Sequence, residues 1–190
     1  MYNKHLSETI ASVNNIPCYD EVKNSIDIFC NHNRVVFCTM GKSAFACRKV
    51  VHTAISYGLS WYNLDVCHAF HGDAGIIKED DLLVFVSKSG ETKETVEVAE
   101  YFKDWETIAM TSNQNSSLSK LCKTNIIIPI VTESSPFGYA PMISTSSYMI
   151  CLHGILCEVI VANKCTINEY ERNHPGGSIG KRILHSKRGS

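Results

Sequence analysis

Small hydroxyl side chains gather in the segment Ser87-Lys88-Ser89-Gly90-Glu91-Thr92, which separates an apolar run from a stretch with helical patterning. We therefore expect a strand, a short loop and the start of a helix there. Free backbone N–H groups and the helix dipole favour an anion at such a point. The hydroxyls of Ser87, Ser89 and Thr92 add donors that suit a phosphate monoester, and Gly90 lets the backbone approach closely. A plain loop with a Ser or Thr N-cap is the alternative.

A second segment of this kind, Thr39-Met40-Gly41-Lys42-Ser43, follows another apolar run. Its last three residues match the end of a nucleotide-binding P-loop, but Val36 stands where that motif needs its first glycine. The nucleotide motif is therefore absent, and the segment is a second candidate loop for an anion.

Three carboxylates accompany these loops. Glu91 and Glu94 fall just before or within a first helical turn, where an acid favours the helix dipole whatever its role. Glu133 follows the apolar run Ile126–Val131, so we expect its carboxylate to face the ligand crevice. Desolvation there is expected to raise its pKa toward that of a useful base.

Two histidines lie in turn-like segments, His71-Gly72-Asp73 and His174-Pro175-Gly176-Gly177. A histidine before Pro-Gly-Gly is held on a rigid, exposed backbone, which suits proton transfer. A metal site would require His68, His71 and His174 to meet in space, and we expect none.

Five apolar runs alternate with helical stretches. Near-continuous apolar runs indicate strands covered on both faces, and the alternation indicates a parallel sheet between two layers of helices. We expect strands at Arg34–Thr39, Trp61–Val66, Leu82–Ser87, Thr107–Thr111 and Ile126–Val131, and helices at Tyr19–Asn31, Ser43–Tyr57, Lys93–Asp104, Ser116–Cys122 and Ile143–Asn163. The predicted fold is therefore α/β, a doubly wound three-layer sandwich that fills one domain, residues 1–190. Ligands of such folds bind at the carboxyl ends of the strands, where both loops fall.

Composition narrows the class of protein. The chain has 190 residues, 44% of them hydrophobic, and a formal net charge of −1, which gives no basic field for nucleic acid. The polar N-terminus lacks a secretion signal. The apolar stretch Met142–Ala162 contains Ser144-Thr145-Ser146-Ser147, His153 and Glu158, so we expect a buried helix and no membrane contact. The nine cysteines include no Cys-x-x-Cys pair and most lie in apolar runs, which predicts buried thiols in a reducing cytoplasm.

Taken together, the motifs resemble the SIS (sugar isomerase) domain of arabinose-5-phosphate isomerases. The matching elements, in order, are Gly41-Lys42-Ser43, His71-Gly72-Asp73, Ser87-x-Ser89-Gly90-Glu91-Thr92, Glu133-x-x-Pro136, Ala140-Pro141 and His174-Pro175-Gly176-Gly177. The match runs from about residue 34 to 184 and implies a five-stranded, flavodoxin-like parallel sheet.

The resemblance also implies a reaction: interconversion of D-ribulose 5-phosphate and D-arabinose 5-phosphate through an enediol, supplying Kdo for lipopolysaccharide or capsules. The family's catalytic positions match Lys42, Glu94, Glu133 and His174, with His71 as a further active-site histidine; its phosphate-binding positions match Ser43, Ser87, Ser89 and Thr92. The residues leave open which glutamate is the base. The mechanism requires no metal or organic cofactor, and family members are usually homotetramers with active sites between subunits.

The chain departs from the family pattern near the expected pocket. Thr39 and Ala44 stand where the family has glycines, and His68 stands where it has a glutamate. Typical members carry two CBS domains after the SIS domain, and we expect a single-domain form without them. Two alternatives remain: an isomerase of hexulose or heptulose phosphates on the same domain, and a non-catalytic module that senses a phosphosugar.

Overall fold

The computed structural model describes residues 1–181 and contains one parallel five-stranded sheet in the order β2-β1-β3-β4-β5. The strands are β1 (Arg34–Thr39), β2 (Ser60–Asp65), β3 (Leu82–Val86), β4 (Glu106–Thr111) and β5 (Thr124–Ile127). The chain first moves to one side of β1 and then returns to build the sheet on the other side. The order therefore reverses between β1 and β3, and the predicted doubly wound, flavodoxin-like α/β fold is confirmed.

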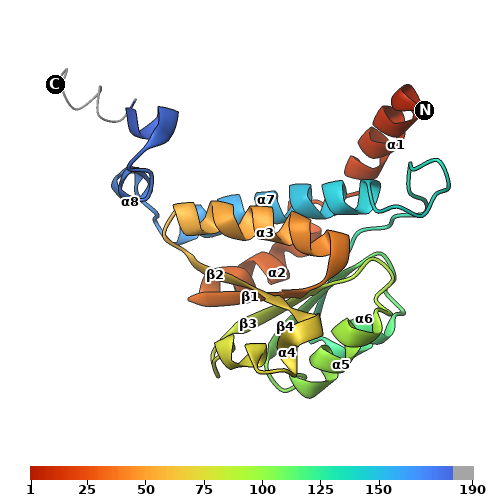
Figure 1. Ribbon diagram of the computed structural model, residues 1–190, viewed down its shortest axis with the longest axis horizontal. Coiled ribbons are helices and arrows are strands. Elements are labelled where there is room, and N and C mark those ends of the chain that lie inside the picture. The colour runs from red at the N-terminus through yellow and green to blue at the C-terminus, as the bar shows by residue number, and fades with distance from the viewer. Residues whose placement is uncertain (182–190) are drawn as a thin grey trace.

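Helices cover both faces of the sheet (Figure 1). On one face lie α2 (Tyr19–Asn31), α3 (Gly41–Ser56) and α7 (Ile143–Ala162), with α1 (Tyr2–Val13) against α7; on the other lie α4 (Val66–Ala69), α5 (Lys93–Tyr101) and α6 (Ser117–Leu121). A 3₁₀ turn, Asp73–Ile76, leads toward β3, and α8 (Ile167–Arg172) follows α7. Crossovers between parallel strands are right-handed, so α3 and α5, which lead in opposite directions along the sheet, cover opposite faces.

Alternate residues of the central strands fill the two apolar layers. Val35 and Phe37 of β1 point into the layer beneath α2, α3 and α7, and Val36 and Cys38 point into the layer beneath α4, α5 and α6. Every residue of β3 is buried. The sheet is thus packed on both faces, and this rigid core fixes the positions of the loops that follow its strands.

The long helix α7 packs on this core. It contacts α1, α2 and α3, and it buries Tyr148, Leu152 and Ile155, as expected for a core helix. By length and composition alone α7 could cross a membrane, with 39% of its most apolar window buried. Ile150 and Val161 lie on its exposed side.

The fifth strand is shorter than predicted. The Ile128 N–H still donates to the Thr111 carbonyl, but Pro129 has no N–H, and the predicted strand to Val131 was wrong beyond Ile127. A loop of residues 128–142 therefore connects β5 to α7. Helix α1, which the apolar pattern did not predict, lies over this loop and α7: its Ser12 hydroxyl is 2.9 Å from that of Ser147.

The cysteines are all free thiols. Cys38, Cys47, Cys122 and Cys151 are buried, as predicted, and burial raises the pKa of Cys47 and Cys151 to about 12. Cys18, Cys67 and Cys157 are exposed and are exceptions to the prediction of buried thiols.

Candidate active site

Glu133 lies at the amino-terminal end of α7. Its Oε2 accepts hydrogen bonds from the backbone N–H groups of Met142 and Ile143, both at 2.8 Å, and from that of Ser144 at 3.4 Å. These are the groups that a helix start leaves without an intrahelical partner. The sequence predicted a carboxylate at a strand end, whereas the structure places it six residues beyond β5, as a remote cap of the next helix.

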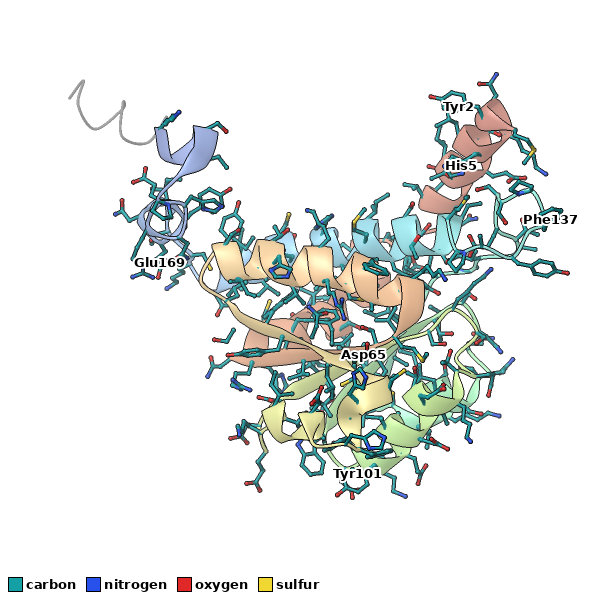
Figure 2. All side chains as sticks on the ribbon, viewed as in Figure 1. Tyr2, His5, Asp65, Tyr101, Phe137 and Glu169 are labelled. Atoms are coloured by element: carbon teal, nitrogen blue, oxygen red, sulfur yellow. The ribbon has the colours of Figure 1, made fainter. Side chains whose placement is uncertain are left out.

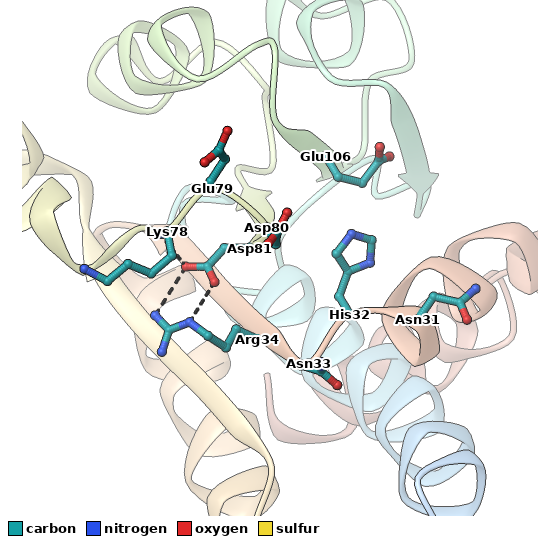
Figure 3. A pocket seen from close by; sticks show the side chains of 9 residues that line it. All are labelled: Asn31, His32, Asn33, Arg34, Lys78, Glu79, Asp80, Asp81 and Glu106. Atoms are coloured by element: carbon teal, nitrogen blue, oxygen red, sulfur yellow. Dashed lines mark hydrogen bonds and ion pairs between the residues drawn. The ribbon is translucent and has the colours of Figure 1, made fainter.

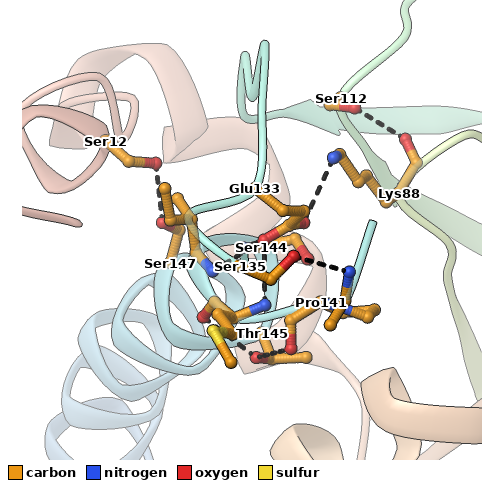
Figure 4. Close-up of polar contacts among 12 residues, drawn as sticks. Ser12, Lys88, Ser112, Glu133, Ser135, Pro141, Ser144, Thr145 and Ser147 are labelled. Atoms are coloured by element: carbon orange, nitrogen blue, oxygen red, sulfur yellow. Dashed lines mark hydrogen bonds and ion pairs between the residues drawn. The ribbon is translucent and has the colours of Figure 1, made fainter. Parts of the chain in front are cut away.

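The other oxygen of Glu133 faces a cation. Oε1 lies 3.1 Å from Nζ of Lys88, and the Glu133 side chain is 1% exposed (Figure 4). Burial alone would raise the pKa of Glu133, but the hydrogen bonds from the start of α7 and the Lys88 ammonium outweigh it. The pKa of this carboxyl therefore lies below its ordinary value, and the expectation of a raised pKa was wrong.

The loop after β3 holds its hydroxyl groups in a compact turn. The Ser87 and Thr92 hydroxyls are 2.9 Å apart, the Gly90 N–H donates to Oγ of Ser87, and the Glu91 N–H donates to Oγ of Ser89. The side chain of Thr92, the N-cap residue of α5, makes no capping bond. The first N–H groups of α5 are thus left for solvent or a ligand, which is the arrangement of a helix-terminus anion site.

Glu91 has a structural role in this loop. Its Oε1 accepts a hydrogen bond of 2.8 Å from the backbone N–H of Ser117, the first residue of α6. This bond lowers the pKa of Glu91. Glu91 therefore ties the loop after β3 to the helix after β4.

Lys42 lies at the start of α3, beside the start of α7. It lines a cavity of about 330 Å³ together with Phe45, Ala46, Pro141, Thr145, Ser146 and Met149. Pro141 and Thr145 flank the backbone N–H groups that Glu133 caps. The structure therefore brings Lys42 and the Glu133 end of α7 to the same edge of the molecule. Ser43, the next residue, is half-buried in the first turn of α3.

Glu94 and His71 lie near opposite ends of α5. Glu94 is exposed in the first turn of α5, where it is close enough to raise the pKa of Cys67 after burial and Asp65. His71 is exposed between α4 and the 3₁₀ turn, and its neighbour Phe70 packs edge-on against Tyr101 at the far end of α5. His71 therefore belongs to the opposite end of α5 from Glu94.

His174 is remote from the other predicted residues of its own chain. Its Nδ1 makes a 2.7 Å hydrogen bond with the Tyr170 carbonyl of α8, and α8 follows the carboxyl end of α7. The 20 residues of α7 span about 30 Å, and Glu133 caps the other end. Figure 2 shows Glu169 of α8 and Phe137 of the loop before α7 at opposite ends of the molecule. One chain alone therefore does not unite His174 with Glu133.

A larger cavity, of about 810 Å³, lies at the opposite edge of the sheet, where the strands begin (Figure 3). Two of its charges form an ion pair: Asp81 accepts from Arg34 at 2.7 and 3.3 Å, and also from the Lys78 N–H at 2.9 Å. These contacts hold the amino ends of β1 and β3 together, so we assign them to the fold. Among residues 1–181, no three His, Cys, Asp or Glu side chains come together as metal ligands do.

Lys88 is the residue of this edge that the sequence did not single out. It fills the variable position of Ser87-x-Ser89, so the motif gave no reason to select it. Fold and site together define a doubly wound α/β protein with uncapped helix starts after β1 and β3 and a buried carboxylate beyond β5.

The chain belongs to the SIS domain family, whose model matches residues 28–156. It is 36% identical over 152 residues to the arabinose 5-phosphate isomerase KpsF of Escherichia coli O6:H1 (strain CFT073), covering 79% of this chain and 46% of that protein. It is 31% identical over 167 residues to the arabinose 5-phosphate isomerase KdsD of Pseudomonas aeruginosa, covering 87% and 51%. The chain thus spans about half the length of the curated relatives it matches.

Solved structures share the whole architecture. An E. coli CFT073 protein in complex with arabinose 5-phosphate superposes with a TM-score of 0.84 at 25% identity, covering 92% of this chain and 95% of that one. A Bacteroides fragilis protein described as a putative phosphosugar isomerase involved in capsule formation gives a TM-score of 0.85 at 26% identity, covering 90% and 94%. The Vibrio vulnificus NanR protein, complexed with ManNAc-6P, shares the fold at 16% identity, with a TM-score of 0.71 and coverage of 100% and 68%.

Proposed function

We propose that the protein is a sugar-phosphate isomerase that interconverts D-ribulose 5-phosphate and D-arabinose 5-phosphate. The observation that carries the proposal is the buried Glu133 carboxylate, held across the sheet edge from the hydroxyl loop Ser87–Thr92. The similarity to arabinose 5-phosphate isomerases and the neighbour bound to arabinose 5-phosphate support the choice of sugar.

In this proposal the phosphate binds at the loop after β3. The hydroxyls of Ser87, Ser89 and Thr92 turn from their mutual hydrogen bonds to the phosphate oxygens, joined by N–H groups at the start of α5. Ser43, at the start of α3, adds a further hydroxyl from the neighbouring strand. These contacts hold the sugar in its open-chain form across the crevice.

Glu133 then acts as the base. It takes a proton from the carbon next to the carbonyl, and the electron pair of that C–H bond forms the enediolate double bond as the carbonyl oxygen becomes anionic. Lys42 stabilises this oxyanion. Return of the proton to the neighbouring carbon completes the isomerisation without any oxidant or reductant. We favour Glu133 over Glu94 because the Glu133 carboxylate is buried at the crevice beside Lys88, whereas Glu94 is exposed to solvent on the surface of α5.

The remaining proton transfers, at hydroxyl groups and in ring opening, fall to His174 and His71. Since α7, about 30 Å long, separates His174 from Glu133 of its own chain, we propose that His174 serves the site of a neighbouring subunit. The proposed assembly is a homotetramer with active sites between subunits. We further propose a cytoplasmic enzyme whose product feeds Kdo synthesis; residues 182–190 lie outside the described residues.

One experiment separates the enzyme from a sensing module. The protein is incubated with ribulose 5-phosphate in deuterated water, and both aldose formation and deuterium at carbon 2 are followed by NMR. An isomerase forms arabinose 5-phosphate that carries deuterium at carbon 2. Tight binding of ribulose 5-phosphate with neither product nor exchange would contradict the proposal and would favour the sensor.

A further inference from the structure

Lys88 connects the two halves of the proposed site. Its Nζ lies 3.1 Å from Oε1 of Glu133, so an ion pair joins the loop after β3 to the start of α7 (Figure 4). The Lys88 side chain is 32% exposed and the Glu133 side chain 1% exposed. The cation is therefore at the boundary with solvent, and the carboxylate is behind it.

The backbone of Lys88 is fixed, while its side chain is not. Its carbonyl accepts three hydrogen bonds: from Oγ1 of Thr111 at 3.0 Å, from Oγ of Ser112 at 2.7 Å and from the Ser112 N–H at 3.0 Å. These bonds fasten the residue to the end of β4. A lysine ammonium is a point charge on a flexible four-carbon stem, so it can change partners without any movement of the loop.

The two oxygens of Glu133 are divided between two tasks. Oε2 accepts the hydrogen bonds from the start of α7, whereas Oε1 faces Lys88. If the Lys88 ammonium moves away, Oε2 keeps its hydrogen bonds to the start of α7, and Oε1 stays buried without a neighbouring cation. A carboxylate oxygen in that position is a stronger base, because burial disfavours its charged form and the compensating charge has gone.

Lys88 also stands between Ser87 and Ser89, whose hydroxyls line the proposed phosphate site. A phosphate monoester carries a charge of about −1.5 to −2 at neutral pH and competes for the ammonium with the single charge of a carboxylate. We infer that Lys88 is a positioning residue that moves from Glu133 to the bound phosphate, so that Oε1 is free to take a proton only when a phosphosugar occupies the site. This inference rests on the proposed function.

The exchange changes the pKa of Glu133 only when a phosphosugar binds. Without substrate, Lys88 and the start of α7 hold the Glu133 carboxyl ionised and its pKa low. Among residues 1–181, the titratable groups that face it are Lys88 and, from the second turn of α7, Tyr148, whose own pKa is raised by burial so that it stays neutral. From α1, His5 is hydrogen-bonded at 2.5 Å to Oγ of the adjacent Ser134. Lys88 is therefore the cation at this carboxylate whose departure alters its basicity.

A carboxyl titration tests the exchange directly. The full chain is labelled with glutamate ¹³C at the carboxyl carbon, and the Glu133 signal is assigned by its loss in Glu133→Gln. Inorganic sulfate is the probe, because it stays a dianion throughout the titration, and sodium chloride of equal ionic strength is the reference. In the wild type we expect sulfate to raise the Glu133 titration midpoint by about one pH unit or more.

Variants isolate the contribution of Lys88. In Lys88→Met the midpoint is already high without sulfate, and sulfate adds less than half of the wild-type shift. Lys88→Arg, which keeps the charge, restores a low midpoint. Lys103→Met removes an exposed pair with Glu100 at 2.7 Å and behaves as the wild type. Equal sulfate shifts in the wild type and in Lys88→Met would overturn the exchange.

Kinetics give a second readout and keep the two proposals apart. With ribulose 5-phosphate, Lys88→Met is expected to raise KM about tenfold or more, since it loses a charged contact to phosphate, while the acid limb of kcat stays where it is in the wild type. An acid limb of kcat that moves in Lys88→Met overturns the exchange alone. The sulfate titration needs no turnover, so a wild type that shows the titration shift but no isomerisation overturns the proposed function instead.

Discussion

Gly90 and Ser116 lie so close together that a side chain on Gly90 would overlap the Ser116 side chain. Gly90 also has a φ of +67°, a conformation that other residues adopt only under strain. Ser116 in turn is buried and caps α6 through its hydroxyl, which accepts from the Ser119 N–H at 3.2 Å. The loop after β3 is thus pressed against the start of the next helix, and Glu91 fastens the same contact.

Gly90→Ala tests this contact. The added methyl group forces the loop away from Ser116. We therefore expect the free energy of unfolding to fall by about 1–3 kcal/mol, seen as a lower melting temperature, and the KM for ribulose 5-phosphate to rise strongly. Gly154→Ala, which adds a methyl group at an exposed position of α7 with open space around it, is the control. Unchanged KM in Gly90→Ala would mean that this loop does not hold the phosphate.

Replacing Glu133 by Gln tests the assignment of the base. The amide keeps an oxygen to accept from the start of α7 but has no useful basicity, so we expect kcat to fall by about 10²- to 10⁴-fold. Binding of arabinose 5-phosphate, measured by calorimetry, should change little. Glu94→Gln is the matched comparison at the exposed glutamate. If Glu94→Gln loses the larger factor in kcat, the base is Glu94 and our assignment is wrong.

The lowered pKa of Glu133 also predicts how stability depends on pH. A carboxyl whose pKa is lower in the folded state stabilises that state above its unfolded pKa, about 4.3, and loses this contribution as the pH falls toward the folded pKa. The melting temperature of the wild type relative to Glu133→Gln should therefore decline as the solution is acidified below about pH 4.3. Thermal unfolding followed by circular dichroism measures it, and a difference that grows on acidification would contradict the lowered pKa.

The hydroxyl loop is tested by Ser89→Ala and Thr92→Ala. A hydrogen bond to a charged group contributes about 1.5–3 kcal/mol, so each change should raise KM by about 10- to 100-fold and leave kcat nearly unaltered. Ser7→Ala, on the exposed side of α1 away from the loop after β3, removes a hydroxyl bonded only locally, to the Lys4 carbonyl at 3.0 Å. Its KM provides the reference for the loss of a hydroxyl. Wild-type KM in both loop variants would contradict the phosphate site.

The separation of Glu133 and His174 predicts complementation between defective subunits. Glu133→Gln and His174→Asn are each expected to be nearly inactive. If sites are shared, a mixed oligomer contains some sites with an intact Glu133 from one subunit and an intact His174 from the other, and activity returns in part. The two variants are dissociated, mixed and reassembled, with each variant reassembled alone as the control. If verified mixed oligomers recover no activity, Glu133 and His174 of different subunits do not share an active site, and the proposal is contradicted.

The strands were predictable because burial on both faces leaves an unmistakable apolar run: β1 has the predicted bounds, and β3 differs by one residue. The end of β5 was not, because apolar residues continue past Pro129, where the hydrogen bonding to β4 stops. Helix α1 was missed although Leu6, Ile10 and Val13 recur at helical spacing; Leu6 and Ile10 are exposed in the structure, and the helix contacts mainly α7.

For the candidate site, the sequence predicted which residues follow the strands but not what they touch. Glu91 and Glu133 are both acids near helix starts; only the tertiary structure shows that each caps a helix remote in sequence. From the sequence, burial alone predicted a raised pKa for Glu133. The three N–H groups and the Lys88 ammonium that lower it come from other segments of the chain, so the sequence could not show them.

Helix α7 connects Glu133 to α8, and its length therefore fixes the position and orientation of α8 relative to Glu133. Each residue advances the helix by about 1.5 Å and turns it by about 100°. Deleting one residue from the middle of α7 would leave both ends folded locally but would swing α8, with His174, by more than a quarter turn about the helix axis. The number of residues in α7 therefore determines where His174 lies in the proposed oligomer, as much as the contacts at the subunit interface do.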